Sequence, residues 1–326
     1  MHTTDYKDLN KKLNKKCEEI IKLKKYIELL EREKSECKCK NTNKTNKTNN
    51  TNNTNNTNNT NNNLIVDNKI KIIELFNKNV KGKNIDLEGQ NVKHYGKEGH
   101  WLEKKMGIKP NNKNKPDIYG YEMKTNSKKI TFGDFSASEY AFSTINKRTK
   151  INEYNKWDNN IELSRDSYIQ YFGESNKDKN NRYSWSGSCV PIYNNWNNCG
   201  QNIVINDNKD IIIKYSYSRD KRDRKSLFPE FIKKDNICIA IWKSDKMKKH
   251  INDKFNEKGF FICKKTKMTF DTICFGKTFN FEYFINGFQN KKIIFDSGMH
   301  QKNTRNYSHF RANKDFWNNL IIEEFL

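Results

Sequence analysis

The stretch PDIYGYEMKT, residues 116–125, carries two carboxylates and a lysine whose types and spacing suit metal-assisted chemistry. Glu122 and Lys124 are two positions apart, so on a β-strand their side chains leave the same face. Asp117 precedes them, at the expected start of the strand. Carboxylate oxygens bind Mg²⁺, and an ammonium group beside a metal-activated water can orient it and offset developing negative charge. The pattern therefore predicts phosphodiester hydrolysis, with Asp117 and Glu122 as metal ligands and Lys124 beside the water.

The spacing by itself is not specific. The same acid-x-Lys triplet occurs at Asp207 and Lys209, for example, as expected in a chain with 31% charged residues. The segment that precedes the strand is more informative. Residues 96–108, GKEGHWLEKKMGI, are predicted to form a helix with an apolar side and a glycine stop at Gly107. This helix would place Glu103 near the strand.

Two segments of 96–125 contain, in order, Gly99, Leu102, Glu103, Gly107, Ile108, Pro116, Asp117, Gly120, Glu122, Lys124 and Thr125. In this order they resemble the signature of PD-(D/E)xK endonucleases of the MvaI/BcnI and LlaMI type, which are related to the mismatch-repair nickase MutH. The resemblance implies a restriction-endonuclease-like core and Mg²⁺-dependent cleavage of double-stranded DNA. It also implies a catalytic set of Glu103, Asp117, Glu122 and Lys124.

A late segment resembles the base-reading part of the same family. The matching run is Arg305, Asn306, Phe310 and Arg311, with Asp296 after a strand and His309 within the run. The sequence departs from the family at Gly298, where an arginine is expected, and at Tyr307, where a histidine is expected. Arginine matches guanine O6 and N7, and a carboxylate can accept from cytosine N4. If Arg305, Arg311 and Asp296 face the major groove, they predict a G·C-rich target, whereas the alternative is a surface turn with solvated arginines.

Two further runs mix aromatic and basic residues, at 181–187 (NRYSWSG) and 217–225 (YSRDKRDRK). Either could contact phosphates or stack on bases. A solvated loop is an equally good interpretation of the second run. The formal net charge of +23 favours a nucleic-acid partner. A coding sequence rich in A and T, which yields many Lys, Asn and Ile residues, is the alternative source of this charge.

The N-terminal part predicts self-association. Residues 5–34 carry a heptad seam, with Ile20 and Ile27 at a positions and Leu23 and Leu30 at d positions, which favours a parallel two-stranded coiled coil and a homodimer. A single amphipathic helix folded onto the main domain is the alternative. The Asn/Thr tract at 41–63 has nothing to bury and is predicted to be a disordered linker. The chain is thus divided into 1–40, 41–63 and an endonuclease domain at 64–326.

The eight cysteines show no paired C-x-x-C spacing, so free thiols in an intracellular, reducing location are expected. A zinc site using Cys37 and Cys39, or His94 and His100, is the alternative. The chain lacks a secretory signal and any apolar run long enough to span a membrane.

Helices and strands interleave irregularly after residue 64, which predicts an α/β or α+β fold with a mixed central sheet. Helices are expected at 67–79, 96–108 and 244–255, with strands at 117–125 and 129–135 side by side. Further strands are expected at 202–218 (a hairpin), 236–243, 259–265, 268–276 and 291–298. The catalytic core is expected at about 64–165 and the DNA-reading elements at about 166–326.

The sequence therefore predicts a type II site-specific deoxyribonuclease. A MutH-like strand nickase or a less specific DNA-degrading nuclease is the alternative within the class. A non-catalytic coiled-coil DNA-binding protein is the alternative outside it, and the intact set of four catalytic candidates argues against it.

Overall fold

The computed structural model describes residues 56–86, 96–109, 114–142, 150–155, 163–266 and 269–326. The predicted coiled coil at 1–40 lies outside these residues, as do Cys37, Cys39 and His94. Residues Thr60–Leu326 form one compact unit. Helix α2 spans Asn56–Asn79 and so begins inside the tract expected to be disordered. Packing of the later residues of α2 holds the helix in place. Adding earlier residues to a helix that already exists costs little free energy, because only the formation of the first turn is unfavourable.

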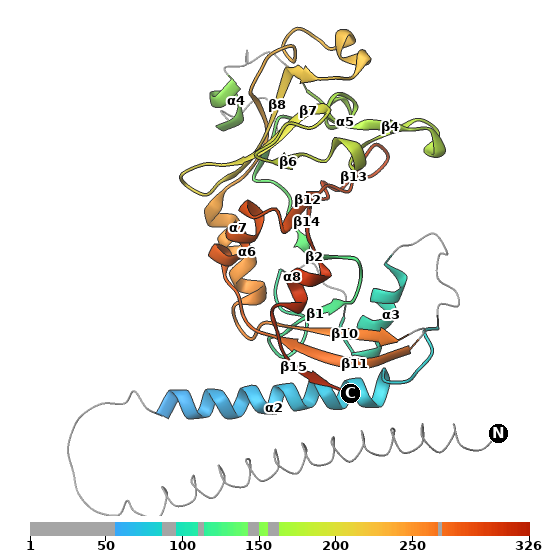
Figure 1. Cartoon of the computed structure of the whole chain (residues 1–326), viewed down its shortest axis with the longest axis vertical. Helices are drawn as coiled ribbons and strands as arrows, with labels where there is room; N and C mark the ends of the chain where they lie inside the picture. Colours follow the sequence, from blue (N-terminus) through green and yellow to red (C-terminus); the bar gives the residue numbers. More distant parts are fainter. Residues whose placement is uncertain (1–55, 87–95, 110–113, 143–149, 156–162, 267–268) are drawn as a thin grey trace, which may run out of the picture. The chain divides into compact units, whose positions relative to one another are not determined.

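A four-stranded mixed sheet contains the strand expected to carry the site (Figure 1). Its spatial order is β1 (Glu122–Thr125), β10 (Phe260–Thr266), β11 (Thr269–Gly276) and β15 (Ile321–Phe325). Strand β1 runs parallel to β10, and the other neighbours are antiparallel. Residues on both sides of position 165 therefore build the sheet that carries the candidate site.

The two faces of this sheet pack against different layers. On one face Met123 and its register partner Phe261 lie in a core shared with α2 and with α3 (Lys97–Lys105). Glu122 and Lys124 alternate with Met123 and therefore leave the other face. Their register partners there, Phe260 and Ile262, belong to the larger core, which includes buried residues of α6 (Ser244–Phe255). The two candidate catalytic side chains thus point toward α6.

The remaining strands form three sheets. A three-stranded sheet has the order β12 (Ile293–Asp296), β14 (His309–Asn313) and β2 (Lys129–Asp134). A five-stranded sheet has the order β3 (Glu139–Tyr140), β9 (Ile237–Trp242), β8 (Ile211–Asp220), β7 (Cys199–Ile205) and β6 (Ile192–Tyr193). The last has the order β13 (Met299–His300), β5 (Arg182–Trp185) and β4 (Glu174–Asn176).

An aromatic cluster centred on Phe132 of β2 holds the helices next to the site. The helices that contribute to it are α6, α7 (Phe281–Gln289) and α8 (Lys314–Asn318). Rings that lie 4.8–6.0 Å from the Phe132 ring, centroid to centroid, are those of Phe255, Phe279, Phe284, Phe316 and Trp317. Edge-on packing of this kind adds to the burial energy and restricts the geometry. It fixes α6 against β2.

The short helices α4 (Lys150–Asn155) and α5 (Arg165–Phe172) lie earlier in the chain.

The mixed α/β fold class is confirmed, as are the three predicted helices. The predicted strands are present, but the one expected at 117–125 spans only Glu122–Thr125, because a turn at 119–120 separates Asp117 from the strand. One pairing differs from the expectation: β1 and β2 are not neighbours, because β1 pairs with β10 and β2 with β14. The expectation that the cysteines are free thiols also needs correction. Cys189 and Cys199 form a disulfide, since the start of β7 passes beside residue 189, whereas Cys238, Cys263 and Cys274 are buried free thiols. Among the described helices, none is long and apolar enough to cross a membrane.

Candidate active site

A tight turn brings Asp117 beside the start of β1. Tyr119 and Gly120 at its centre have φ values of 50° and 85°, in the left-handed region that glycine adopts without strain. The chain therefore reverses within the few residues between Asp117 and Glu122. The Asp117 carboxylate folds back onto the strand, and its Oδ2 accepts a hydrogen bond of 2.9 Å from the Met123 N–H.

The Glu122 carboxylate is almost fully buried, with 3% of the residue exposed. Its Oε1 accepts from Lys124 Nζ at 2.7 Å and lies 3.0 Å from Lys254 Nζ. Its Oε2 is buried without a hydrogen-bond partner among the described residues. A buried carboxylate oxygen without a partner is costly, so this atom indicates a site completed by a cation.

The electrostatics of the neighbouring groups agree with this interpretation. Burial, and next the charge of Glu122, raise the pKa of Asp117 to about 6. Burial also lowers the pKa of the Lys124 ammonium, and the adjacent Glu122 opposes that shift. Two close carboxylates in a poorly solvated place repel each other until a cation lies between them. Asp117 and Glu122 therefore fit a divalent metal ion with oxygen ligands.

One cavity of about 510 Å³ contains all four catalytic candidates, Glu103, Asp117, Glu122 and Lys124, in its wall. Glu103 reaches it from α3, where its Oε2 also lies 3.3 Å from His100 Nδ1. Arg311 of β14 lines the same cavity. The structure thus brings the predicted catalytic set together with one of the predicted base-reading residues.

Lys254 is part of this cavity and was missed by the sequence analysis. Its side chain is only 14% exposed. On α6 the buried residues are Met247, Ile251 and Phe255. Position 254 lies on the same helical face, seven residues after Met247 and three after Ile251. A lysine at a core-facing position was the available signal, but it is hard to recognise in a helix with so many lysines.

The base-reading candidates on the sheet are paired with each other. Arg311 Nε lies 3.1 Å from Asp296 Oδ2. The contact is an ion pair without the alignment of a hydrogen bond, because Nε has no hydrogen-bond partner among the described residues. His309 lies on the same strand, where burial and then the charge of Arg311 lower its pKa. Phe310 alternates inward and is fully buried, so its match to the family run is a core residue.

The loop before β14 holds the other two candidates. Arg305 is 68% exposed, lies 3.2 Å from Asp134 Oδ2 through Nη2, and stacks over the Tyr307 ring at 4.7 Å. The Asn306 side chain instead binds within the protein, where its Oδ1 accepts from Arg165 Nε at 2.8 Å. Arg305 is therefore presented to solvent, and Asn306 ties its loop to α5.

Arg165, the first residue of α5, is a second residue that the sequence analysis missed. Besides Asn306, it donates from Nη2 to Asn303 Oδ1 at 2.7 Å and to the Arg305 carbonyl at 2.9 Å. Its Nη1 donates to the His300 carbonyl at 3.4 Å. One guanidinium thus holds the loop that carries Arg305. No sequence signal linked residues so far apart in the chain.

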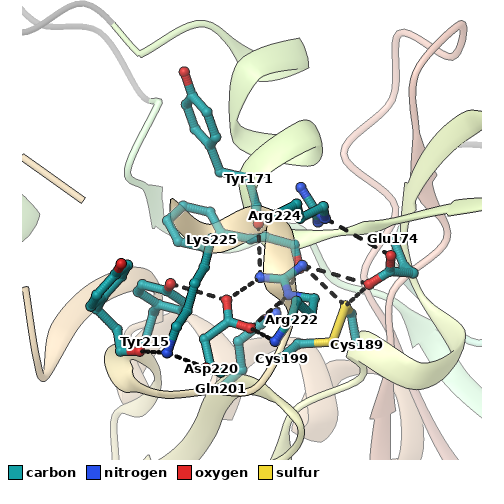
Figure 2. Close-up of polar contacts among 12 residues, drawn as sticks. Tyr171, Glu174, Cys189, Cys199, Gln201, Tyr215, Asp220, Arg222, Arg224 and Lys225 are labelled. Atoms are coloured by element: carbon teal, nitrogen blue, oxygen red, sulfur yellow. Dashed lines mark hydrogen bonds and ion pairs between the residues drawn. A yellow bond between two sulfur atoms is a disulfide. The ribbon is translucent and has the colours of Figure 1, made fainter. Parts of the chain in front are cut away.

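Two arginines of the basic run at 217–225, Arg222 and Arg224, bind within the protein (Figure 2). Arg219 of the same run is exposed, so both interpretations of the run are corrected only for those two arginines. Arg222 donates from Nη2 to Asp220 Oδ2 at 2.6 Å and from Nη1 to the Gly173 carbonyl at 2.8 Å. Arg224 donates from Nη1 to the Gln170 carbonyl at 2.7 Å. These arginines join the end of β8 to the end of α5, because the buried carboxylate of Asp220 and the open carbonyls at the helix end need donors.

Comparisons with known proteins identify the family to which the chain belongs. A family model described as LlaMI restriction endonuclease matches residues 80–325. The type II restriction enzyme ScrFI of Lactococcus lactis subsp. cremoris is 40% identical over 272 residues, which covers 78% of this chain and 98% of that enzyme.

Among solved structures, the chain is similar to the restriction endonuclease MvaI. The complex of MvaI with its cognate DNA substrate matches with 14% identity and a TM-score of 0.48, over 80% of this chain and 97% of that one. MvaI in the absence of DNA matches with 16% identity and a TM-score of 0.37, over 81% and 99%. By the family match and the ScrFI relative, the chain belongs to the LlaMI restriction endonuclease family, whose members are sequence-specific type II restriction enzymes.

Proposed function

We propose that this chain hydrolyses phosphodiester bonds of double-stranded DNA as a PD-(D/E)xK enzyme with Mg²⁺ as its metal. Type II restriction enzymes generally use divalent metal ions. The observation that carries the proposal is the convergence of Asp117, Glu122 and Lys124 in one cavity, where Glu122 Oε2 is buried without a partner among the described residues. Asp117 and Glu122 would hold the ion through carboxylate oxygens, as Mg²⁺ prefers.

Each residue of the set has a proposed task. When bound, the ion polarises the phosphate and lowers the pKa of a coordinated water. Lys124 donates hydrogen bonds to the attacking water or to a phosphate oxygen and offsets the negative charge that develops in the transition state. The buried surroundings strengthen this interaction, because they exclude bulk water. Glu103, which approaches from α3 in the cavity wall, completes the catalytic set.

The DNA would lie over the opening of this cavity, with base reading by β14 and the loop before it. Arg311 lines the cavity and Arg305 is exposed nearby in sequence. Asp296 and His309 flank Arg311, and Asn306 holds the loop. The presence of Arg311 in the wall of the cavity supports this arrangement. We infer that G·C pairs are read, because Arg forks match guanine.

Two further proposals concern the whole chain. Residues 5–34 pair two chains as a parallel coiled coil, which raises the effective concentration of a second nuclease domain on one DNA. The enzyme works inside the cell, where its DNA substrate lies.

The proposal is tested by incubating the purified full-length protein with plasmid DNA in Mg²⁺ and in EDTA. Cleavage is expected with Mg²⁺ and not with EDTA. Asp117→Ala and Lys124→Ala are each expected to abolish cutting while the far-ultraviolet circular dichroism spectrum stays unchanged. Cutting by Asp117→Ala at the wild-type rate would overturn the metal site, because the site would have lost an anionic ligand.

A further inference from the structure

Two lysines converge on a single oxygen of Glu122. Lys124 Nζ lies 2.7 Å from Oε1 and reaches it from the same strand, and Lys254 Nζ lies 3.0 Å from it and reaches it from α6. Both lysines are largely buried, with exposed side-chain fractions of 7% and 14%. Burying two like charges side by side is costly. The charges of both lysines also act on Asp117, the second carboxylate of the site, but both ammonium groups contact Glu122 Oε1, and it is this double contact that needs a reason.

The reason follows from what Lys124 does in the reaction. In the structure its ammonium is bound to Glu122, whereas the proposed chemistry requires it at a water or a phosphate oxygen. The ion would bind Glu122 through the open oxygen, Oε2. If Lys124 were the only donor to the other oxygen, Oε1, its departure would leave that buried oxygen without a partner. Removing one member of a buried ion pair is strongly destabilising, because the other charge remains uncompensated. The site therefore needs another donor that stays on Glu122.

We propose that Lys254 is a positioning residue of the active site, which stays bound to Glu122 Oε1 so that Lys124 can turn to the scissile phosphodiester. This inference rests on the proposed function. The position of Lys254 is suited to the task, because the neighbouring Phe255 is buried in the aromatic cluster around Phe132 and fixes the end of α6. The Lys124 ammonium lies 5.4 Å from the same Phe255 ring, a loose contact that it can exchange for a phosphate.

A first experiment needs no catalysis. The melting temperature of the metal-free protein in EDTA is measured for Lys124→Met, Lys254→Met and the double variant. Each single variant keeps one lysine on Glu122, so its melting temperature should fall only slightly. The double variant leaves Glu122 without a lysine, so its melting temperature should fall by more than the sum of the two single decreases. Adding Glu122→Gln to the double variant should recover most of the loss.

Strictly additive decreases in melting temperature would show that Lys124 and Lys254 do not share Glu122, and would overturn the proposal. If the double variant does not fold, the triple variant with Glu122→Gln decides: a folded triple variant supports the proposal, and an unfolded one contradicts it.

A second experiment measures the single-turnover cleavage rate with Mg²⁺ and, separately, DNA affinity with Ca²⁺ in place of Mg²⁺. Lys254→Met is expected to slow cleavage by about 10- to 100-fold, the usual loss for groups that orient a metal ligand, with DNA affinity unchanged. Lys254→Arg should restore most of the rate. The control is Lys249→Met on the same helix, since Lys249 is 75% exposed and pairs only with Asp253 at the surface among the described ion pairs.

Wild-type cleavage by Lys254→Met would overturn the inference. A wild-type protein that does not cut would instead overturn the proposed function, and the melting experiment would still decide whether Lys254 and Lys124 share Glu122.

Discussion

Arg311 and Asp296 face each other diagonally across the β12–β14 pair, with Nε 3.1 Å from Oδ2. Asp296 is opposite His309 in register, and Arg311 is two residues further along, so the two side chains share a face of the sheet. Because the contact uses the edge of the guanidinium that carries Nε, the end of the fork remains available to a guanine. Asp296 would then orient Arg311 and not read a base independently.

Arg311→Ala should therefore relax or abolish site preference. A bidentate arginine–guanine contact contributes about 1–3 kcal/mol of discrimination, or roughly 5- to 150-fold between the right and the wrong base. The measurement is the ratio of cleavage rates on the preferred site and on sites with one changed base pair. Lys128→Ala is the control, because Lys128 is exposed beside β1 and would at most contact a phosphate. It should weaken binding to all sequences alike. An unchanged ratio in Arg311→Ala would show that the reader lies elsewhere.

Arg165→Ala should weaken sequence discrimination without removing any group that touches the DNA. The variant deletes the four hydrogen bonds that Arg165 donates to residues 300–306, so the loop with Arg305 loses these contacts with α5. We expect lower cleavage at the preferred site and a nearly unchanged rate on weak sites. Gln170→Ala is the matched control, since Gln170 is exposed on the same helix. If Arg165→Ala and the wild type discriminate equally between preferred and weak sites, Arg165 does not hold the loop for base reading.

Asp117→Asn should stabilise the metal-free protein at neutral pH. The folded protein holds the Asp117 proton up to a pKa of about 6, whereas the unfolded chain releases it near 3.8. Stability therefore falls as the pH rises from about 4 to about 6, by at most about 3 kcal/mol, and stays low above this range. The asparagine variant avoids this loss and keeps an acceptor for the Met123 N–H. Melting in EDTA should show a gain at pH 8 and little at pH 4. A melting temperature of Asp117→Asn below that of the wild type at pH 8 would contradict the raised pKa of the buried Asp117 carboxylate.

The fragment 64–326 should retain cleavage. It keeps Ile72 and Phe76, by which α2 joins the core beneath the sheet, and Val80 directly after the helix. Light scattering should show a dimer for the full chain and a monomer for the fragment, because the coiled coil supplies the pairing. If the fragment folds but cuts no substrate, the N-terminal residues belong to the assembly of the active site.

The local parts of the site could be predicted from the sequence. Helix α3 and strand β1 depend on signals within a few residues: an apolar face that includes Trp101 and Leu102, and the stop at Gly107, whose φ is +74°. The alternation of Glu122, Met123 and Lys124 gave the correct common face for the carboxylate and the ammonium.

The long-range parts could not be predicted. Pairing of β1 with β10 brings in α6, and with it Lys254, through contacts that no local pattern encodes. For the arginines at 222 and 224 the sequence left DNA contact and a solvated loop open, because their charge is visible in the sequence, whereas the burial of the Asp220 carboxylate that binds Arg222 is not. Phe310 matches the family's base-reading run, but its alternation with His309 and Arg311 is that of a strand with one buried face.

The most direct test of the account is cleavage of a randomised duplex DNA library by the full-length protein with Mg²⁺, followed by sequencing of the new ends. We predict that the ends share one short G·C-rich site, that EDTA or Asp117→Ala prevents cutting, and that Arg311→Ala blurs the site. Ends without a shared sequence, or cutting that persists in Asp117→Ala, would contradict a sequence-specific endonuclease built on this cavity.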